Sequence, residues 1–186
     1  MTQPNRIALI SMVLLVAILP SFAQRLHTLQ QITNDGDCEN TAKIPADALK
    51  AVLESKVAKE ALLDEPPVQD PGKLFGGSQF KLGHAGQIAL LICGTGQMTG
   101  ADNAWYWIVA TPYTHPRVVL FEGTDALWLL PQSHYGYHDI ESGWAVAAQS
   151  HEKTFRFNGS KHILASERCY MPSPDNNGAN KRVPCY

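Results

Sequence analysis

The stretch Lys153–Ala165, KTFRFNGSKHILA, decides the fold. Its centre is Asn158-Gly159, a dipeptide that accepts positive φ at both positions of a tight turn. Residues of high β-propensity lie on both sides, in runs too short for helices. The stretch therefore predicts a β-hairpin with strands over 153–157 and 161–165, and it leaves the register open.

Similar apolar runs precede this hairpin along the chain, separated by Gly, Asn, Asp and Pro. The close spacing leaves no room for crossover helices, so neighbouring strands should pair antiparallel as a meander. The expected strands cover 87–93, 104–111, 117–122, 126–130 and 142–149.

One helix is expected upstream, over about 45–63. Pro45 suits a first helical position, and apolar residues recur at helical spacing on one stripe. The helix should end before a proline-rich linker, and its apolar stripe should pack on the sheet. The stripe consists of Leu49, Val52, Leu53, Val57 and Leu62.

Together these patterns predict an α+β fold. An N-terminal amphipathic helix packs on an antiparallel meander of six to eight strands, with a small sandwich or a half-barrel as alternatives for the sheet, and two disulfides hold the domain. The expected divisions are a signal peptide (1–23), an N-terminal segment with the helix and linker (24–72), the β domain (73–168) and a disulfide-closed tail (169–186).

The first residues have the pattern of a secretory signal peptide. Arg6 precedes an apolar run from Ile7 to Leu19, and Ser21 and Ala23 are small residues at the positions that precede a cleavage site. The run is shorter than the roughly 20 residues of a spanning helix, and no later stretch could span a bilayer. We therefore expect a periplasmic or secreted protein.

The chain contains 4 cysteines. In an exported protein an even number favours disulfides. The sequence allows three pairings, and we favour Cys169–Cys185 with Cys38–Cys93, because the first would close a polar, turn-rich tail.

Charge and motifs exclude several functions. The formal net charge of −2 is unlike that of a nucleic-acid-binding domain. The glycines at 94, 96 and 100 lack the spacing of a dinucleotide loop, and no Gly-x-Ser-x-Gly elbow occurs. His151-Glu152 lacks the second histidine of a zinc protease, because residue 155 is Phe. No cofactor is expected.

The stretch SHYGYHDIESGW, residues 133–144, carries the candidate chemistry. On an extended strand His134 and His138 would lie roughly 13 Å apart at about 3.3 Å per residue, too far for one metal ion. A bend at Gly136 would let them converge, with Asp139 as a third ligand. His138 and Asp139 are also the weak candidates for acid–base catalysis.

Aromatic residues suggest a binding surface. The candidate contact residues are Tyr135, Tyr137, His138, Trp105 and Trp144. For Trp105 we favour a place in the core under the helix over an exposed aromatic platform, although both faces of a strand can be buried only if both are covered.

The segment Gly136-Tyr137-His138-Asp139-Ile140, followed by Phe155–Gly159, resembles the FG-GAP repeat of integrin-type β-propellers. In that family, acidic calcium ligands precede the glycine at alternate positions. Here those positions are Pro131, Ser133 and Tyr135, so the calcium loop is missing, and one copy cannot close a propeller. The resemblance implies a local strand–turn–strand shape.

These observations favour a non-enzymatic exported binding protein, such as an inhibitor, an immunity-type protein or an envelope accessory protein. Its partner would be a protein or a component of the cell envelope. One alternative is an exported hydrolase that uses His138 and Asp139. Another is an envelope protein that binds metal through His134, His138 and Asp139.

Overall fold

The structure is a computed structural model that describes residues 30–33, 43–63, 70–95, 104–111, 115–146, 148–173 and 180–185. The predicted signal peptide and Cys38 lie outside the described residues. In the part of the chain that is described, no helix has the length and apolar character needed to cross a membrane.

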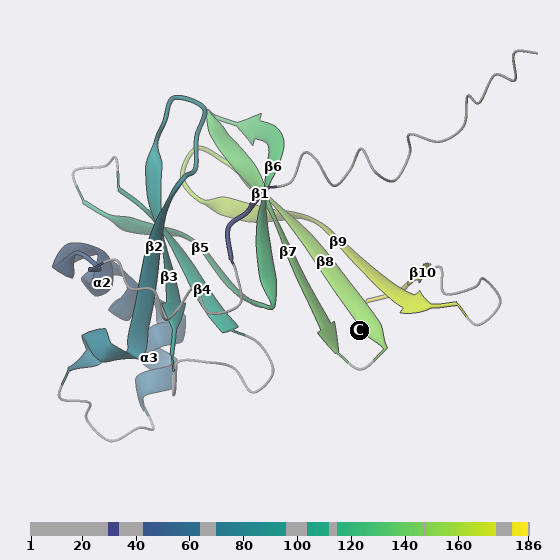
Figure 1. The fold of residues 1–186 in the computed structure, drawn as a ribbon, viewed down its shortest axis with the longest axis horizontal. Coiled ribbons are helices and arrows are strands. Elements are labelled where there is room, and N and C mark those ends of the chain that lie inside the picture. Colours follow the sequence, from purple (N-terminus) through teal and green to yellow (C-terminus); the bar gives the residue numbers. More distant parts are fainter. Residues whose placement is uncertain are drawn as a thin grey trace, which may run out of the picture.

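In the described residues, two helices and one 3-10 turn come before most of the strands (Figure 1). The helical elements are α2 (Ala46–Leu53), α3 (Lys56–Leu63) and η1 (Pro71–Leu74). The strands are β1 (Gln30–Gln31), β2 (Phe75–Lys81), β3 (Ile88–Gly94), β4 (Ala104–Ala110), β5 (Arg117–Thr124), β6 (Ala126–His134), β7 (Tyr137–Val146), β8 (Gln149–Phe157), β9 (His162–Pro172) and β10 (Asn180–Val183).

The predicted α+β fold, with one helix on a single meander, is wrong. The protein is mainly β, and its strands form two sheets, ordered β1-β6-β7-β8-β9-β10 and β2-β3-β4-β5. The helix expected over 45–63 is replaced by two short helices, separated at Glu54 and Ser55. The prediction of antiparallel pairing is confirmed in both sheets.

The four-stranded sheet is apolar on both faces, which explains why a second sheet exists. On β4, Trp107 and Val109 belong to a cluster with residues of α2 and α3, such as Val52 and Ala58. The alternate residues of β3 and β4 belong to a second cluster, which contains residues of β6 to β8. A sheet with two apolar faces must be covered on both sides. Figure 1 shows the helices beside β2–β5, with β6–β9 on the other side.

Ser55 connects the helical segment to the sheet. The Nε1 of Trp107, whose side chain is fully buried, donates to Ser55 Oγ at 3.2 Å. The same hydroxyl accepts from the backbone N of Ala58 at 3.4 Å. Serine hydroxyls that bond to nearby backbone favour helix termini over helix interiors, which accounts for the break between α2 and α3.

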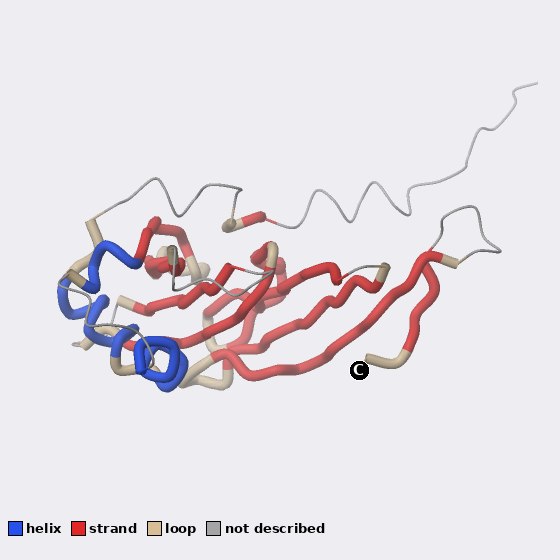
Figure 2. The backbone as a smooth tube through the Cα atoms, turned by 90° about the horizontal axis from the view of Figure 1, so that it is seen from below, coloured by secondary structure: helices blue, strands red, loops and turns tan. Residues whose placement is uncertain are grey.

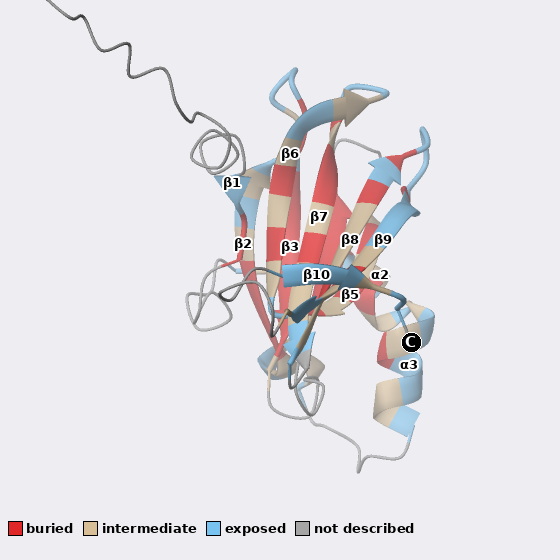
Figure 3. Cartoon of the chain, turned by 90° about the vertical axis from the view of Figure 1, so that its right-hand side faces the viewer, coloured by how far each residue is buried: buried red, intermediate tan, exposed pale blue. Residues whose placement is uncertain are grey.

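The chain changes sheets between Thr124 and Ala126, the end of β5 and the start of β6. The Thr124 Oγ1 hydroxyl shares its one proton between Gly143 O at 2.7 Å and Ala126 O at 3.1 Å, which fixes this corner. From here the strands β6 to β9 follow one another and extend away from the helices (Figure 2). Figure 3 shows buried segments along β6 and β7, while β10 is exposed.

Two of the hairpins in the six-stranded sheet, β6–β7 and β8–β9, have different turns. Tyr135 and Gly136 form the two-residue turn between β6 and β7, and both have positive φ, 52° and 81°. The Asn158-Gly159 turn is longer, because Phe157 pairs with His162. Asn158 Oδ1 accepts from the backbone N of Ser160 and of Lys161, both at 2.9 Å.

The tail after β9 is closed as predicted by the disulfide Cys169–Cys185. The predicted partner pair is Cys38 and Cys93. Cys93 is buried on β3, but Cys38 lies outside the described residues, so this second pairing stays a prediction.

Candidate functional site

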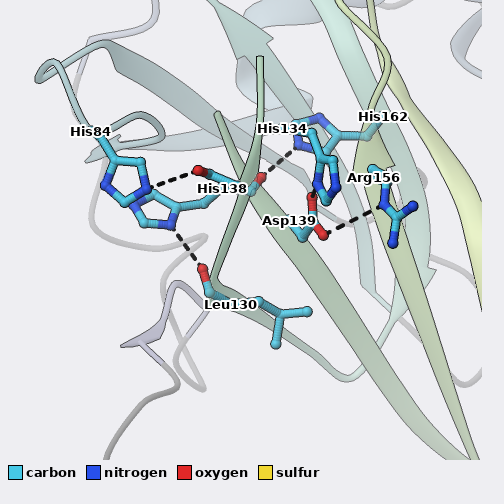
Figure 4. A network of polar contacts seen from close by, with 8 residues as sticks. His84, Leu130, His134, His138, Asp139, Arg156 and His162 are labelled. Carbon is cyan, nitrogen blue, oxygen red and sulfur yellow. Dashed lines mark hydrogen bonds and ion pairs between the residues drawn. The ribbon is translucent and has the colours of Figure 1, made fainter. Parts of the chain in front are cut away.

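The tight turn at Tyr135-Gly136 brings His134 and Asp139 together (Figure 4). His134 Nδ1 lies 2.7 Å from Asp139 Oδ1, and because a carboxylate only accepts, the imidazole donates. The Asp139 side chain is 4% exposed and that of His134 is 35% exposed. A buried carboxylate therefore orients a partly exposed imidazole through its Nδ1.

Arg156 completes the surroundings of this carboxylate. Its Nε lies 3.9 Å from Asp139 Oδ2. The guanidinium comes from β8, the strand next to β7. The sequence analysis missed Arg156 because register alone decides which β8 residue lies beside Asp139.

His138 lies apart from this dyad. Ser133 and His138 are paired residues of the hairpin, and His138 Nδ1 donates to Leu130 O at 2.8 Å. The ring of His138 contacts that of His84, with 4.3 Å between centroids. His84 Nε2 in turn lies 3.0 Å from Ser133 Oγ. His84 follows β2, so the sequence offered no signal that it would meet this hairpin.

His162 is the most enclosed histidine of the group, with 5% of its surface exposed. Its Nε2 donates to His138 O at 2.9 Å. Burial lowers the pKa of His162 below its usual value of 6.5, against the smaller raising effects of this hydrogen bond and of Asp139. Burial thus favours the neutral form of His162, and its ring donates to the backbone of β7.

The bend at Gly136 thus joins two of the three predicted metal ligands, His134 and Asp139, and separates the third. Residues on a strand alternate between faces, and His138 is directed to Leu130 and His84. Among the described residues, the group of three potential ligands whose donor atoms lie close together is a different one, His151, Cys169 and Cys185.

The predicted contact residues have very different surroundings. Tyr135 is 75% exposed at the hairpin tip, whereas Tyr137 is 7% exposed and its ring packs at a tilt against that of Phe157. Trp105 is half-buried against Trp107 and Phe121 under the helices. Trp144 is half-buried and stacks on His151, with an interplanar angle of 15°. Tyr137 is thus a core residue, Trp105 packs against the core, and the exposed candidate is Tyr135.

A cleft that the sequence analysis missed lies on the six-stranded sheet, with a volume of about 470 Å³. We call it the Trp128 cleft; its lining residues are Asp125, Ala126, Trp128, Glu141, Gly143, Trp144, Ala145, Ser150, His151 and Glu152. A Cβ on Gly143 would lie 2.9 Å from Cζ3 of Trp128. The absence of a side chain at Gly143 therefore lets the indole lie close against the sheet.

Acidic side chains line this cleft, and one arginine organises two of them. Arg168 Nη2 lies 3.2 Å from Glu141 Oε2 and 3.1 Å from Glu152 Oε2. Asp125 Oδ2 accepts from Ala145 N at 3.0 Å. Three carboxylates and one guanidinium leave the cleft with negative charge beside an aromatic ring. A run of alternating residues cannot reveal such a group, because its members come from three strands and a corner.

Comparisons with protein-family models, with curated proteins and with solved structures find no match for this chain, so the resemblance to an FG-GAP repeat stays a prediction.

Proposed function

We propose that this chain is an exported binding protein whose Trp128 cleft receives a basic side chain, lysine or arginine, of a protein partner. The observation that carries the proposal is the indole of Trp128 beside Glu141 and Glu152 in a cleft of about 470 Å³. Ligand sites commonly have 300–1,000 Å³ and pair an aromatic surface with a few polar groups.

The charge of the cleft supports a cationic ligand. Arg168 compensates part of the charge of Glu141 and Glu152, and Asp125 adds a further carboxylate. A cation placed over an indole gains roughly 0.5–2 kcal/mol, depending on how far it is desolvated. The side chain of an incoming arginine would meet both the ring and the acidic rim.

The arrangement favours binding over catalysis at this cleft. A pair of carboxylates that hydrolyses glycosides needs one member to carry a proton to the leaving group. Here Glu141 and Glu152 both contact the same guanidinium nitrogen, an arrangement in which each carboxylate is held in an ion pair.

Export is part of this proposal. The signal-like segment 1–23 supports it, and so does the Cys169–Cys185 disulfide, since disulfides persist in oxidising compartments. N-terminal sequencing of the protein recovered from the periplasm or medium of a secreting host tests it. We expect the recovered protein to begin at Gln24. A protein that stays in the cytoplasm with residues 1–23 still attached would contradict export.

Calorimetric titration with a tri-arginine peptide tests the cleft. We expect saturable binding that weakens about tenfold in Trp128→Ala, as the loss of a cation–π contact of about 1.4 kcal/mol implies. Glu152→Gln should weaken it too. Tyr135→Ala is the matched control, because this exposed aromatic lies at the hairpin tip.

Two outcomes would overturn the assignment. Binding that survives Trp128→Ala but is lost in Tyr135→Ala would move the binding surface to the hairpin. Trp128-dependent binding of a neutral oligosaccharide such as chitotetraose, without binding of tri-arginine, would replace the basic side chain with a sugar.

A second candidate function rests on the His134–Asp139 dyad. The dyad has the geometry of a general base, with Nδ1 held at 2.7 Å from a buried carboxylate. It would make this an exported hydrolase in which His134, rather than His138, removes a proton from water. Turnover of ester or peptide substrates that is lost in His134→Gln but kept in His84→Gln would establish it, and equal turnover in the two variants would exclude it.

A further inference from the structure

His151, Cys169 and Cys185 gather at the far end of the six-stranded sheet. His151 on β8 and Cys169 on β9 are directly paired residues, and His151 Nδ1 lies 3.1 Å from Cys169 Sγ. Cys185 reaches the same place from the tail through the disulfide. Nδ1 and the two sulfur atoms all lie within 4.8 Å of one another.

We propose that reduction of the Cys169–Cys185 disulfide opens a Zn²⁺ site formed by His151 Nδ1 and the two thiolates. Two thiolates and an imidazole are a ligand set that Zn²⁺ prefers, with a fourth position left for water. The disulfide is then a redox gate: the oxidised protein holds its tail covalently, and the reduced protein can hold it through the metal ion.

The backbone fixes two of the three ligands in advance. His151 and Cys169 are both buried on paired strands. The imidazole of His151 stacks on the ring of Trp144, with 4.5 Å between ring centroids. The Trp144 ring also contacts Lys153, whose Nζ lies 4.4 Å from the ring centroid. Locked ligand orientations reduce the ordering that metal binding would otherwise require.

The third ligand has room to adjust. Cys185 is exposed, and a pocket of about 510 Å³ lies beside the disulfide. Its lining includes Arg168 and Arg182, whose positive charge favours thiolates over thiols. It also includes Glu167, a carboxylate that could take the fourth position in place of water.

The chemistry balances with a dithiol reductant. The dithiol gives two electrons and two protons to the disulfide, becomes a disulfide itself and leaves Cys169 and Cys185 as thiols. Binding of Zn²⁺ then releases the two thiol protons to solvent, because thiolates are the ligands. On reoxidation the two thiolates give two electrons to an acceptor disulfide, which takes up two protons from solvent and becomes two thiols; the Cys169–Cys185 bond forms again and the ion is released.

Cobalt titration of the full exported chain tests the proposal, since Co²⁺ bound to thiolates gives a charge-transfer absorption that the disulfide form cannot give. One sample is kept oxidised. The other is reduced with a phosphine, which becomes the phosphine oxide, and is then freed of reductant. We expect one equivalent of Co²⁺ to bind only to the reduced sample, to be displaced by Zn²⁺, and to protect Cys169 and Cys185 from alkylation.

Two variants separate this site from adventitious binding. His151→Asn should weaken Co²⁺ binding by at least about 100-fold, since even the partners of metal ligands contribute 10–100-fold. His115→Asn, at an exposed histidine, should leave the affinity unchanged. A thermal melt of oxidised His151→Asn shows whether this variant is folded, and the alkylation pattern of the wild type provides a readout that needs no variant.

The proposal is overturned if reduced wild-type protein binds no Co²⁺. It is also overturned if the oxidised protein binds Co²⁺ equally well, or if folded His151→Asn keeps the wild-type affinity.

Discussion

Lys153 and Glu122 join the two sheets through a largely buried ion pair. Lys153 Nζ on β8 lies 2.9 Å from Glu122 Oε1 on β5, and the side chains are 24% and 10% exposed. Burial raises the pKa of Glu122 above its usual 4.5, although the hydrogen bond and the charge of Lys153 act in the opposite direction. The cost of desolvation is thus only partly offset by the partner, as is common for buried pairs.

This pair predicts a defined pH dependence of stability. Between pH 4.5 and the raised native pKa, the native state binds more protons at Glu122 than the unfolded chain does. The contribution of Glu122 is therefore complete below pH 4.5 and is lost as pH rises through the native pKa. In urea titrations, the free energy of unfolding of wild type minus that of Glu122→Gln should fall as pH rises from that value.

The control is Glu60→Gln on α3, where the carboxylate is 58% exposed. Its difference from wild type should change little over the same range. A Glu122 difference that grows with pH would mean that the ion pair dominates over burial.

For His162 we expect the opposite change of stability with pH. Its pKa is lowered by burial from 6.5, so below pH 6.5 the unfolded chain binds a proton that the native state resists. The stabilising contribution is present above pH 6.5 and is lost as pH falls through the lowered native pKa. His162→Gln, which keeps an N–H for His138 O, should show a weaker loss of stability in this acid range by urea titration.

The exposed His115 provides the comparison for this variant. His115→Gln should follow the wild-type pH profile. If His162→Gln follows it as well, another group causes the acid sensitivity.

The sequence predicted local strands better than their assembly. β4 and β5 occupy nearly the ranges expected from their apolar runs, 104–111 and 117–122. The run at 142–149 spans a turn instead, because β7 ends at Val146 and β8 begins at Gln149. Strand content is a local property, whereas the division into two sheets depends on what covers each face.

The signal for the second sheet was present in β3 and β4. Ala89–Cys93 and Tyr106–Ala110 are buried at every position, so they read as continuous apolar runs, which indicate a strand covered on both faces. One helix cannot cover both faces of a sheet. These two runs therefore indicate that a second sheet or helix covers the other face.

The candidate site was predictable only where its residues are close in sequence. His134 and Asp139 are five residues apart and meet through one turn. Arg156 contacts Asp139 from β8, while His84 and His162 contact Ser133 and His138 from other segments. The positions of these residues depend on how the strands pair. A single sequence specifies that register only weakly when polar residues occupy both faces of a strand.

Gly136 is the position where the β6–β7 turn most restricts the sequence. Its φ of 81° is left-handed, a conformation that costs an L-residue roughly 1–2 kcal/mol. Gly136→Ala should therefore lower the free energy of unfolding by about 1 kcal/mol in urea titration. It should also disturb the His134–Asp139 contact, visible as a shift of the His134 resonances in NMR.

Gly123→Ala is the matched control for this substitution, since its φ is not left-handed and its nearest neighbour would be Trp105 at 3.4 Å. It should leave the His134 resonances in place. An unchanged stability in Gly136→Ala would show that the turn can readjust without strain.

Gly143 lets the indole of Trp128 lie close to the sheet in the Trp128 cleft. A methyl group there would lie 2.9 Å from Cζ3 of Trp128, closer than real contacts allow, and 3.1 Å from Cη2, which is a tight contact. Because the indole is a rigid ring on β6, Gly143→Ala should push it away from the sheet, and overpacking of this kind costs about 1–3 kcal/mol. Acrylamide quenching of Trp fluorescence should increase, and binding of tri-arginine should weaken.

Trp quenching reports the position of the Trp128 ring, and tri-arginine binding reports whether the cleft binds a basic side chain. Trp128→Phe in the Gly143→Ala background should remove the increase in quenching, which identifies Trp128 as the residue that moved. If Gly143→Ala leaves quenching unchanged, the indole does not rest on Gly143. If quenching increases while tri-arginine binds as in wild type, the position of the ring is correct but the cleft is not where a basic side chain binds.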